Sequence, residues 1–304
     1  MHAIEIKQLC KTYDNGVEAL KNIDLTIQSG DFFALLGANG AGKSTTIGLL
    51  TSLLTKTSGS IFICGIDLDK NPTQAKQYLG LVPQEINLNI FETCEQILIN
   101  QAGYYGIPRS EATMQATTLL KQLGLWDKRH SIARNLSGGM KRRLMIARAL
   151  MHKPRVLILD EPTAGVDIEI RRSMWDFLAR TNAAGTTIIL TTHYLEEAEQ
   201  LCKNIAIIDQ GKLVENTSTK ALLATLQHQT YVFTTQEPMD ILPSLEPWIT
   251  TKIDLHTFEL RVDSQHTLND VFARLDQHGM RVQSLRNKTN RLEELFMDLI
   301  RHGH

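Results

Sequence analysis

The chain has 304 residues and an apolar content of 42%, which suit a folded globular protein with one large and one smaller domain. Its 32 lysines and arginines are balanced by 33 aspartates and glutamates, so no overall basic charge favours nucleic acid as a partner. The four cysteines are scattered without a Cys-x-x-Cys pair, which argues against a zinc site or disulfide framework and suits a reducing cytosol.

Alternating apolar and polar residues open the chain and predict half-buried strands over residues 4–9 and 20–27. Tyr13 stands at the end of the first of these segments. Such a ring can stack on adenine, but a lone tyrosine at a strand end is more often a packing residue. The first residues lack the charged and then apolar pattern of a secretory leader, and no apolar run is long enough to span a bilayer. We therefore expect any membrane association to come through a partner.

A glycine-rich turn follows the apolar run Phe32–Leu36 and precedes a segment whose Ile47, Leu50 and Leu54 share a helical face. The order strand, turn, lysine-hydroxyl, helix predicts a phosphate-binding loop, which we call the phosphate loop. Glycines leave backbone N–H groups open to phosphate oxygens, and a helix N-terminus adds free donors. Its residues are Gly37, Ala38, Asn39, Gly40, Ala41, Gly42, Lys43, Ser44 and Thr45.

The side chains that follow the glycines support the same prediction. Lys43 supplies a positive charge for the β- and γ-phosphates, and Ser44 supplies a hydroxyl for Mg²⁺. The alternative is a glycine-rich connection that matches the pattern by chance, and the flanking strand and helix make that interpretation poor. We expect this chain to bind a nucleotide.

The middle of the chain predicts a helical insertion over residues 95–125, after an apolar run that ends in Pro83-Gln84. Ser137, Gly138 and Gly139 then open a further helix and form a second potential anion site. Taken alone, a serine N-cap followed by glycines is the better interpretation of these three residues. The basic cluster 141–143 predicts a solvated helix face.

Two predicted strands end in polar residues. The apolar run Val156–Leu159 leads into Asp160 and Glu161, and parallel sheets place their chemistry at such strand ends. Asp160 can hold Mg²⁺ while Glu161 faces a water, whereas two solvated turn carboxylates would be unusual after so apolar a strand. His193 follows the β-branched strand 186–192, and a structural and a functional role are equally open for it.

The remaining residues predict a short helix over 195–201, a hairpin over 205–214 and a domain boundary near 225–229. Strands near 231–233, 257–262 and 282–285, a helix capped by Thr267 and another after Asn290 predict a small α+β accessory domain. The expected domains are residues 1–225 and 226–304.

In this order the segments of residues 4–225 resemble the ATP-binding subunits of ABC transporters. The resemblance implies an α/β fold, a P-loop NTPase core with antiparallel β and helical subdomains. Tyr13 stands where the family has its adenine-stacking aromatic, which reverses the packing preference. The resemblance identifies residues 37–45 as Walker A, 136–140 as the signature loop, 156–160 as Walker B and 164–167 as the D-loop. It also identifies three single residues: Gln84 as the Q-loop glutamine, Glu161 as the catalytic glutamate and His193 as the switch histidine.

The wording Leu-Ser-Gly-Gly-Met-Lys-Arg-Arg is most similar to the ABC-2 export branch. Met140 replaces the family's usual glutamine, and Ala-Gly-Val-Asp replaces the common Ser-Ala-Leu-Asp in the D-loop. Because phosphate contact should come from Ser137 and backbone N–H groups, Met140 leaves the binding prediction unchanged.

The resemblance implies that two copies of the chain close over two ATP molecules, each held between Walker A of one copy and the signature loop of the other. Lys43, Glu161 and His193 are then the catalytic residues, and Ser44, Gln84 and Asp160 hold Mg²⁺. The nucleotide contacts are Tyr13, residues 37–45, Gln84, Ser137, Gly138 and Gly139. The implied partners are a second copy and an integral-membrane ABC-2 permease that docks at residues 84–98, on the cytoplasmic face of the bacterial inner membrane, without nucleic acid.

Two other functions are compatible with parts of this pattern. A non-transport ABC ATPase of DNA repair or translation would carry coiled-coil insertions, zinc cysteines or a second cassette, and none of these is visible in the sequence. A non-hydrolysing regulatory subunit is disfavoured because Glu161 and His193 are intact. The sequence indicates neither the cargo nor the role of residues after 225.

Overall fold

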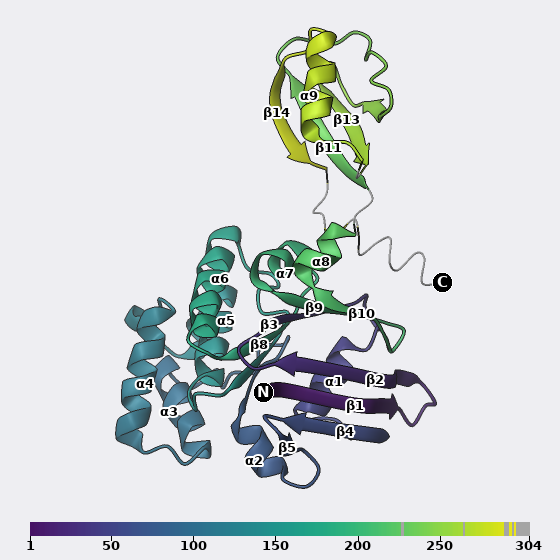
Figure 1. The fold of residues 1–304 in the computed structure, drawn as a ribbon. Coiled ribbons are helices and arrows are strands. Elements are labelled where there is room, and N and C mark those ends of the chain that lie inside the picture. The colour runs from purple at the N-terminus through teal and green to yellow at the C-terminus, as the bar shows by residue number, and fades with distance from the viewer. Residues whose placement is uncertain (226–227, 264, 289–291, 294, 296–304) are drawn as a thin grey trace. The chain divides into compact units, whose positions relative to one another are not determined.

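The structure is a computed structural model that describes residues 1–225, 228–263, 265–288, 292–293 and 295 (Figure 1). It divides into two compact units between Ser218 and Thr219. The boundary expected after residue 225 differs from this division by helix α8 (Thr219–Ala224), which groups with the second unit. The two units are described separately below.

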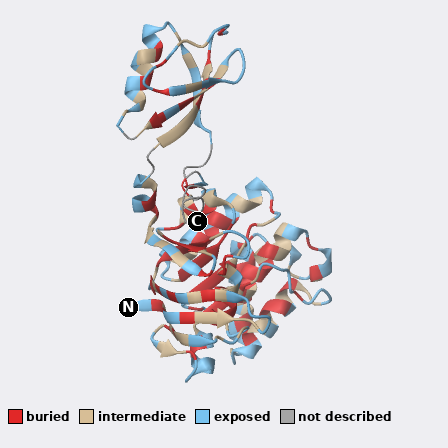
Figure 2. Cartoon of the chain, turned by 90° about the vertical axis from the view of Figure 1, so that its right-hand side faces the viewer, coloured by how far each residue is buried: buried red, intermediate tan, exposed pale blue. Residues whose placement is uncertain are grey.

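A six-stranded sheet in the order β10-β9-β3-β8-β7-β6 forms the centre of the first unit. All neighbouring pairs are parallel except β9 and β10, which form the predicted hairpin. Every residue of β3 and β8 is buried, which agrees with the apolar runs Phe32–Leu36 and 188–190; buried residues are red in Figure 2. The strands are β3 (Phe32–Leu36), β6 (Leu79–Val82), β7 (Val156–Asp160), β8 (Thr187–Thr191), β9 (Asn204–Asp209) and β10 (Lys212–Ser218).

A second, antiparallel sheet in the order β2-β1-β4-β5 packs with helix α1 (Lys43–Leu50) against the central sheet. Ile6 of β1, Ile47 of α1 and Ile158 of β7 are buried in one hydrophobic cluster. The predicted antiparallel subdomain is therefore confirmed, and its alternating pattern follows from having one face on the core. Its strands are β1 (His2–Thr12), β2 (Glu18–Gln28), β4 (Ser58–Ile63) and β5 (Ile66–Asp67).

The predicted helical insertion is confirmed by α3 (Cys94–Tyr104) and α4 (Arg109–Gln122), which lie side by side (Figure 1). Thr93 caps α3 through a capping box with Gln96. No helix of the described residues is long and apolar enough to cross a bilayer. The other helices of this unit are α2 (Pro72–Gln77), the 3₁₀ turns 126–128 and 133–135, α5 (Gly138–Ala149), α6 (Ile168–Ala183) and α7 (Leu195–Leu201).

The basic cluster at the start of α5 does not form a simple solvated face, so that prediction is wrong. Arg142 is only 8% exposed, and its Nη1 donates to the carbonyl of Pro83 at 3.1 Å. Arg143 also turns toward the protein and donates to the carbonyl of Leu123 at 3.0 Å. Backbone carbonyls of neighbouring segments therefore accept hydrogen bonds from two of the three cations.

The second unit contains an antiparallel sheet in the order β12-β13-β11-β14 and helix α9 (Leu268–Gln277), as expected for a small α+β domain. Phe233 and Phe258 face each other in register and stack at 5.2 Å, and Val271 and Leu275 of α9 complete their cluster. The helix expected after Asn290 falls mostly outside the described residues. The strands are β11 (His228–Thr235), β12 (Ile249–Lys252), β13 (Thr257–Asp263) and β14 (Val282–Asn287).

Candidate functional site

The carboxyl edge of the central sheet brings the predicted site residues of four strands together. Strand β3 leads into the phosphate loop, β6 leads to Gln84, β7 ends at Asp160 and β8 leads to His193. Because these strands are parallel, all four of their carboxyl ends lie at the same edge. The site is therefore assembled by strand direction from segments far apart in the chain.

At two positions of the phosphate loop, a side chain larger than that of glycine would not fit. Gly42 caps α1 with a φ of 115°, and a Cβ there would lie 2.9 Å from the carbonyl oxygen of Ala19. A Cβ on Gly37 would lie 2.3 Å from the carbonyl oxygen of Ile208. The loop therefore packs closely against β2 and β9. The first turn of α1 offers the unpaired N–H donors of a helix N-terminus.

The ammonium of Lys43 lies across this loop. Its Nζ donates to the carbonyls of Gly37 at 2.7 Å and Ala38 at 3.0 Å. Burial lowers the pKa of Lys43, while the charges of Glu161 and Asp160 raise it. The cation and the two carboxylates that follow β7 are therefore close enough to influence one another.

Tyr13 lies beside the end of the phosphate loop, although it precedes Thr45 by 32 positions. Its Oη and the Oγ1 of Thr45 are 3.1 Å apart, and the Nζ of Lys11 lies 5.0 Å from the centre of its ring. The structure thus places this aromatic ring next to the last residue of the phosphate loop.

The segments that follow strands β6, β7 and β8 meet at Glu161. Its Oε2 accepts a hydrogen bond from Nε2 of Gln84 at 3.1 Å and lies 3.2 Å from Nδ1 of His193. Its N–H donates to the carbonyl of Thr191 at 3.0 Å, and its φ of 48° lies in the left-handed region. A non-glycine residue in that region costs about 1–3 kcal/mol and is retained where the surroundings demand it.

Asp160 and Glu161 form a pair of neighbouring carboxylates balanced by cations. Burial raises the pKa of Asp160, the hydrogen bond from Thr191 lowers it, Glu161 raises it, and Lys43 and Arg142 lower it. Sequence reasoning missed Arg142, because nothing in the run 141–143 distinguishes the buried guanidinium from its neighbours. Only the approach of α5 to Pro83 shows that it faces this edge.

The side chains predicted to hold Mg²⁺ offer the ligands that this ion prefers. Ser44 has an exposed hydroxyl at the start of α1, and Asp160 has a carboxylate at the end of β7. Nε2 of Gln84 donates to Glu161, so its amide oxygen is the atom available to a cation. Hydroxyl, carboxylate and amide oxygens suit a hard divalent ion, and this donor set fits Mg²⁺.

The signature residues occupy a separate place. Ser137 is the N-cap of α5, and its Oγ accepts a hydrogen bond from the N–H of Met140 at 3.3 Å. Among the described residues, no hydrogen bond joins Ser137, Gly138 or Gly139 to the phosphate loop. Ser137 and Gly138 are exposed, so this helix N-terminus is open to a ligand or another chain.

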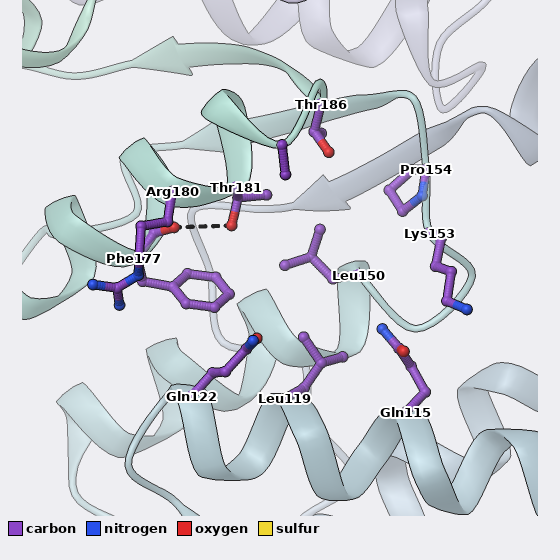
Figure 3. Close-up of a pocket in the computed structure, with 11 residues that line it drawn as sticks. Gln115, Leu119, Gln122, Leu150, Lys153, Pro154, Phe177, Arg180, Thr181 and Thr186 are labelled. Atoms are coloured by element: carbon purple, nitrogen blue, oxygen red, sulfur yellow. Dashed lines mark hydrogen bonds between the residues drawn. The ribbon is translucent and has the colours of Figure 1, made fainter.

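A hollow of about 300 Å³ between α4, α6 and the turn at Lys153 is unrelated to this edge (Figure 3). Leu119, Leu150 and Phe177 line it together with polar residues such as Arg180. None of the predicted site residues lines it, so the candidate site is the strand edge and not this hollow.

Several known proteins are similar to this chain in sequence. The family model described as "ABC transporter" matches residues 20–164. The linearmycin resistance ATP-binding protein LnrL of Bacillus subtilis (strain 168) is 35% identical over 92% of this chain and 93% of its own length. The Nod factor export ATP-binding protein I of Burkholderia pseudomallei (strain 1710b) is 36% identical over 97% and 96%.

A solved structure extends the comparison to nucleotide-bound proteins. It is described as the dimeric structure of a post-hydrolysis state of the ATP-binding cassette MJ0796 bound to ADP and Pi. This chain matches it with a TM-score of 0.66 and 27% identity, over 71% of this chain and 98% of that one.

Proposed function

The chain belongs to the ABC transporter family as an ATP-binding subunit and ATPase, and from that premise we propose that it powers export through a separate ABC-2 permease. The observation that carries the mechanism is that one chain holds two half-sites. The strand edge offers the phosphate loop and Glu161, while Ser137 is exposed on a helix N-terminus with no described bond to that loop. Two copies closing over two ATP molecules would complete both sites, as ATP joins the subunits and hydrolysis releases them.

Each residue of the strand edge then has a role in ATP hydrolysis. Lys43 and the N-terminus of α1 bind the phosphates, and Tyr13 stacks on the adenine. Ser44, Asp160 and Gln84 would hold Mg²⁺, which would supply positive charge against the phosphate oxygens. The hydrogen bond from Gln84 and the contact with His193 orient the Glu161 carboxylate to take a proton from water.

His193 has the exposure that a γ-phosphate contact needs. Its side chain is 52% exposed, whereas that of Glu161 is only 14% exposed. Because Nδ1 faces Glu161, Nε2 is the ring nitrogen that can reach a phosphate. A contact of this kind would make the Glu161–His193 pair sensitive to the presence of the terminal phosphate.

The permease-docking surface that we propose is the segment 84–98. It exposes three large apolar side chains, Ile86, Ile90 and Phe91, the last of which is 73% exposed. Apolar side chains gathered on one exposed segment suit a protein partner. The names of the relatives support export, and a permease partner would hold the chain at the cytoplasmic face of the bacterial inner membrane.

The substitution Glu161→Gln tests this proposal. It keeps the shape of the side chain but removes the base, so we expect ATP binding to persist while hydrolysis falls at least about 100-fold. A phosphate-release assay measures the loss, and light scattering after gel filtration with ATP should reveal an accumulated dimer. Glu196→Gln, an exposed change on α7, is the matched control. Wild-type turnover by Glu161→Gln would remove Glu161 from its role.

A further inference from the structure

A further, buried carboxylate near the site has no part in the mechanism above. Glu197 of α7 lies four residues after His193 and is 0% exposed. Its carboxylate accepts hydrogen bonds from Oγ1 of Thr163, at 3.1 and 3.3 Å, and from Nε1 of Trp175, at 2.7 Å. Donors from the loop after β7 and from helix α6 thus converge on one buried acid.

Burying a carboxylate costs free energy unless its oxygens are fully hydrogen-bonded. Burial raises the pKa of Glu197, whereas the neighbouring Thr192 hydroxyl and the hydrogen bonds from Trp175 and Thr163 lower it. Thr163 is itself only 1% exposed, so its hydroxyl has no easy replacement partner. A buried network of this kind favours one arrangement of its segments, because any other leaves polar groups unpaired.

The segments that Glu197 joins are the two that carry the reacting side chains. Thr163 follows Glu161 by two residues, and Glu197 follows His193 by four. The same segments continue from the paired strands β7 and β8, and the bond from the Glu161 N–H to the Thr191 carbonyl extends that pairing. The bonds from Thr163 to Glu197 add a link beyond the strand ends, where the sheet no longer joins the two segments. The separation of 3.2 Å between Glu161 and His193 depends on how these two segments are oriented.

Helix α6 adds a further contact to both segments. Nη2 of Arg171 donates to the carbonyl of Val166 at 3.4 Å, and its guanidinium lies 4.2 Å from the centre of the Tyr194 ring. Tyr194 in turn lies 4.0 Å from His193, ring centre to ring centre. Trp175 and Arg171 therefore link one helix to the residues after Glu161 and to those around His193.

We propose that Glu197 is a positioning residue that sets His193 against Glu161, because its bonds with Thr163 join the helix that follows His193 to the loop that follows Glu161. The inference rests on the roles proposed above for Glu161 and His193. It implies that the residues after Glu161 and those after His193 move together, so that a shift of either segment displaces the other. A purely structural role would instead affect stability alone.

The test removes one donor and keeps the volume. Thr163→Val deletes the hydroxyl, Thr163→Ser retains it, and Trp175→Phe removes the indole donor but keeps an aromatic ring. Thr181→Val is the matched control, because Thr181 lies in the same helix as Trp175 but bonds to the Phe177 carbonyl and lines the unrelated hollow (Figure 3). Steady-state ATP hydrolysis by the purified full-length chain gives kcat and KM, and circular dichroism confirms folding.

We expect Thr163→Val to lower kcat about tenfold or more with KM for ATP unchanged, because small misplacements of catalytic groups are costly. Thr163→Ser should recover most of the activity, Trp175→Phe should show a smaller loss, and Thr181→Val should match wild type. The decisive comparison repeats Thr163→Val in a His193→Ala background. There it should cost less than about twofold, since the residue being positioned is gone. Wild-type kcat in Thr163→Val, or the same loss in both backgrounds, would overturn the proposal.

The two proposals fail in different ways. An active Glu161→Gln enzyme rejects the role of Glu161 whatever the Thr163 variants do. An inactive Glu161→Gln enzyme together with an unimpaired Thr163→Val enzyme rejects only the positioning role of Glu197.

Discussion

The central sheet of the first unit and the sheet of the second unit differ in strand direction, and the predicted site residues gather at one edge of the central sheet. In the central sheet β3, β6, β7 and β8 run parallel, so the segments after them converge on Glu161. In the second unit all neighbouring strands are antiparallel, so β11 and β12 end at one edge of the sheet while β13 and β14 end at the other. Strand direction, more than composition, decides where distant residues can form a site.

The two regions also differ in how well the backbone and charge preferences of single residues agree with the fold. At the strand edge Glu161 has a left-handed backbone, and two carboxylates are adjacent. In the second unit, Phe233 and Phe258 stack within an apolar cluster, and Thr267 and Asp270 form a capping box at the start of α9. Local conflicts concentrate at functional sites, whereas a region built for packing can satisfy each level at once.

The largest effect that we expect is the loss of activity in Lys43→Ala. Removing a charge aimed at the phosphates should lower ATP hydrolysis about 100- to 1,000-fold and weaken ATP binding, with little change in folding. Titration with a fluorescent ATP analogue measures the affinity. Lys70→Ala, at an ammonium that is 79% exposed, provides the control. Unchanged nucleotide binding in Lys43→Ala would contradict the assignment of the phosphate loop.

Phe258→Ala should show whether the two units unfold independently. The change removes a fully buried, stacked ring, so we expect the second unit to lose about 3–5 kcal/mol of stability. Hydrogen exchange should rise in strands β11 and β13 while ATP hydrolysis by the first unit persists. Ile241→Ala, an exposed apolar residue of the same unit, should leave exchange unchanged. Equal loss of exchange protection in the central sheet would show that the two cores unfold together.

The smallest effect is a pH dependence at the amino edge of the central sheet. His152 stacks on Tyr105 at 3.7 Å, and its Nε2 lies 2.8 Å from the carbonyl of Leu79, the first residue of β6. Burial lowers the pKa of His152, while the bond to Leu79 raises it. The folded state therefore favours the neutral ring, and stability is full above the unfolded pKa of about 6.5 and falls as the pH drops below it.

Urea unfolding at pH 7.5 and at pH 5.5 measures this loss, which cannot exceed about 1.4 kcal/mol per pH unit for one group. His152→Phe keeps the ring stack and should reduce the change in the free energy of unfolding between the two pH values. The absolute free energy of unfolding of this variant does not test the prediction. An identical change in both proteins would assign the pH dependence to other groups. ATP affinity should be the same in His152→Phe and in the wild type, since His152 lies at the edge of the sheet opposite the site.

Much of the site could be predicted from the sequence because its signals are local. The phosphate loop combines glycines, a lysine and a hydroxyl within nine residues, and Asp160 and His193 directly follow β-strands. Arg142 and Glu197 could not be found in this way. Arg142 is the middle one of three consecutive cations, and Glu197 is one acidic residue among several on α7. Their importance comes from burial and from partners far along the chain, which no local pattern encodes.

The sequence by itself determined the strands, the glycine-rich turn and the antiparallel and helical subdomains, because backbone preference and apolar periodicity act within a few residues. Only the tertiary structure decided that Gln84 and His193 meet on Glu161 and that Tyr13 reaches Thr45. It also decided that Thr163 and Trp175, which lie in different segments, share the buried carboxylate of Glu197. Those contacts depend on strand order and helix packing, which are properties of the whole folded chain.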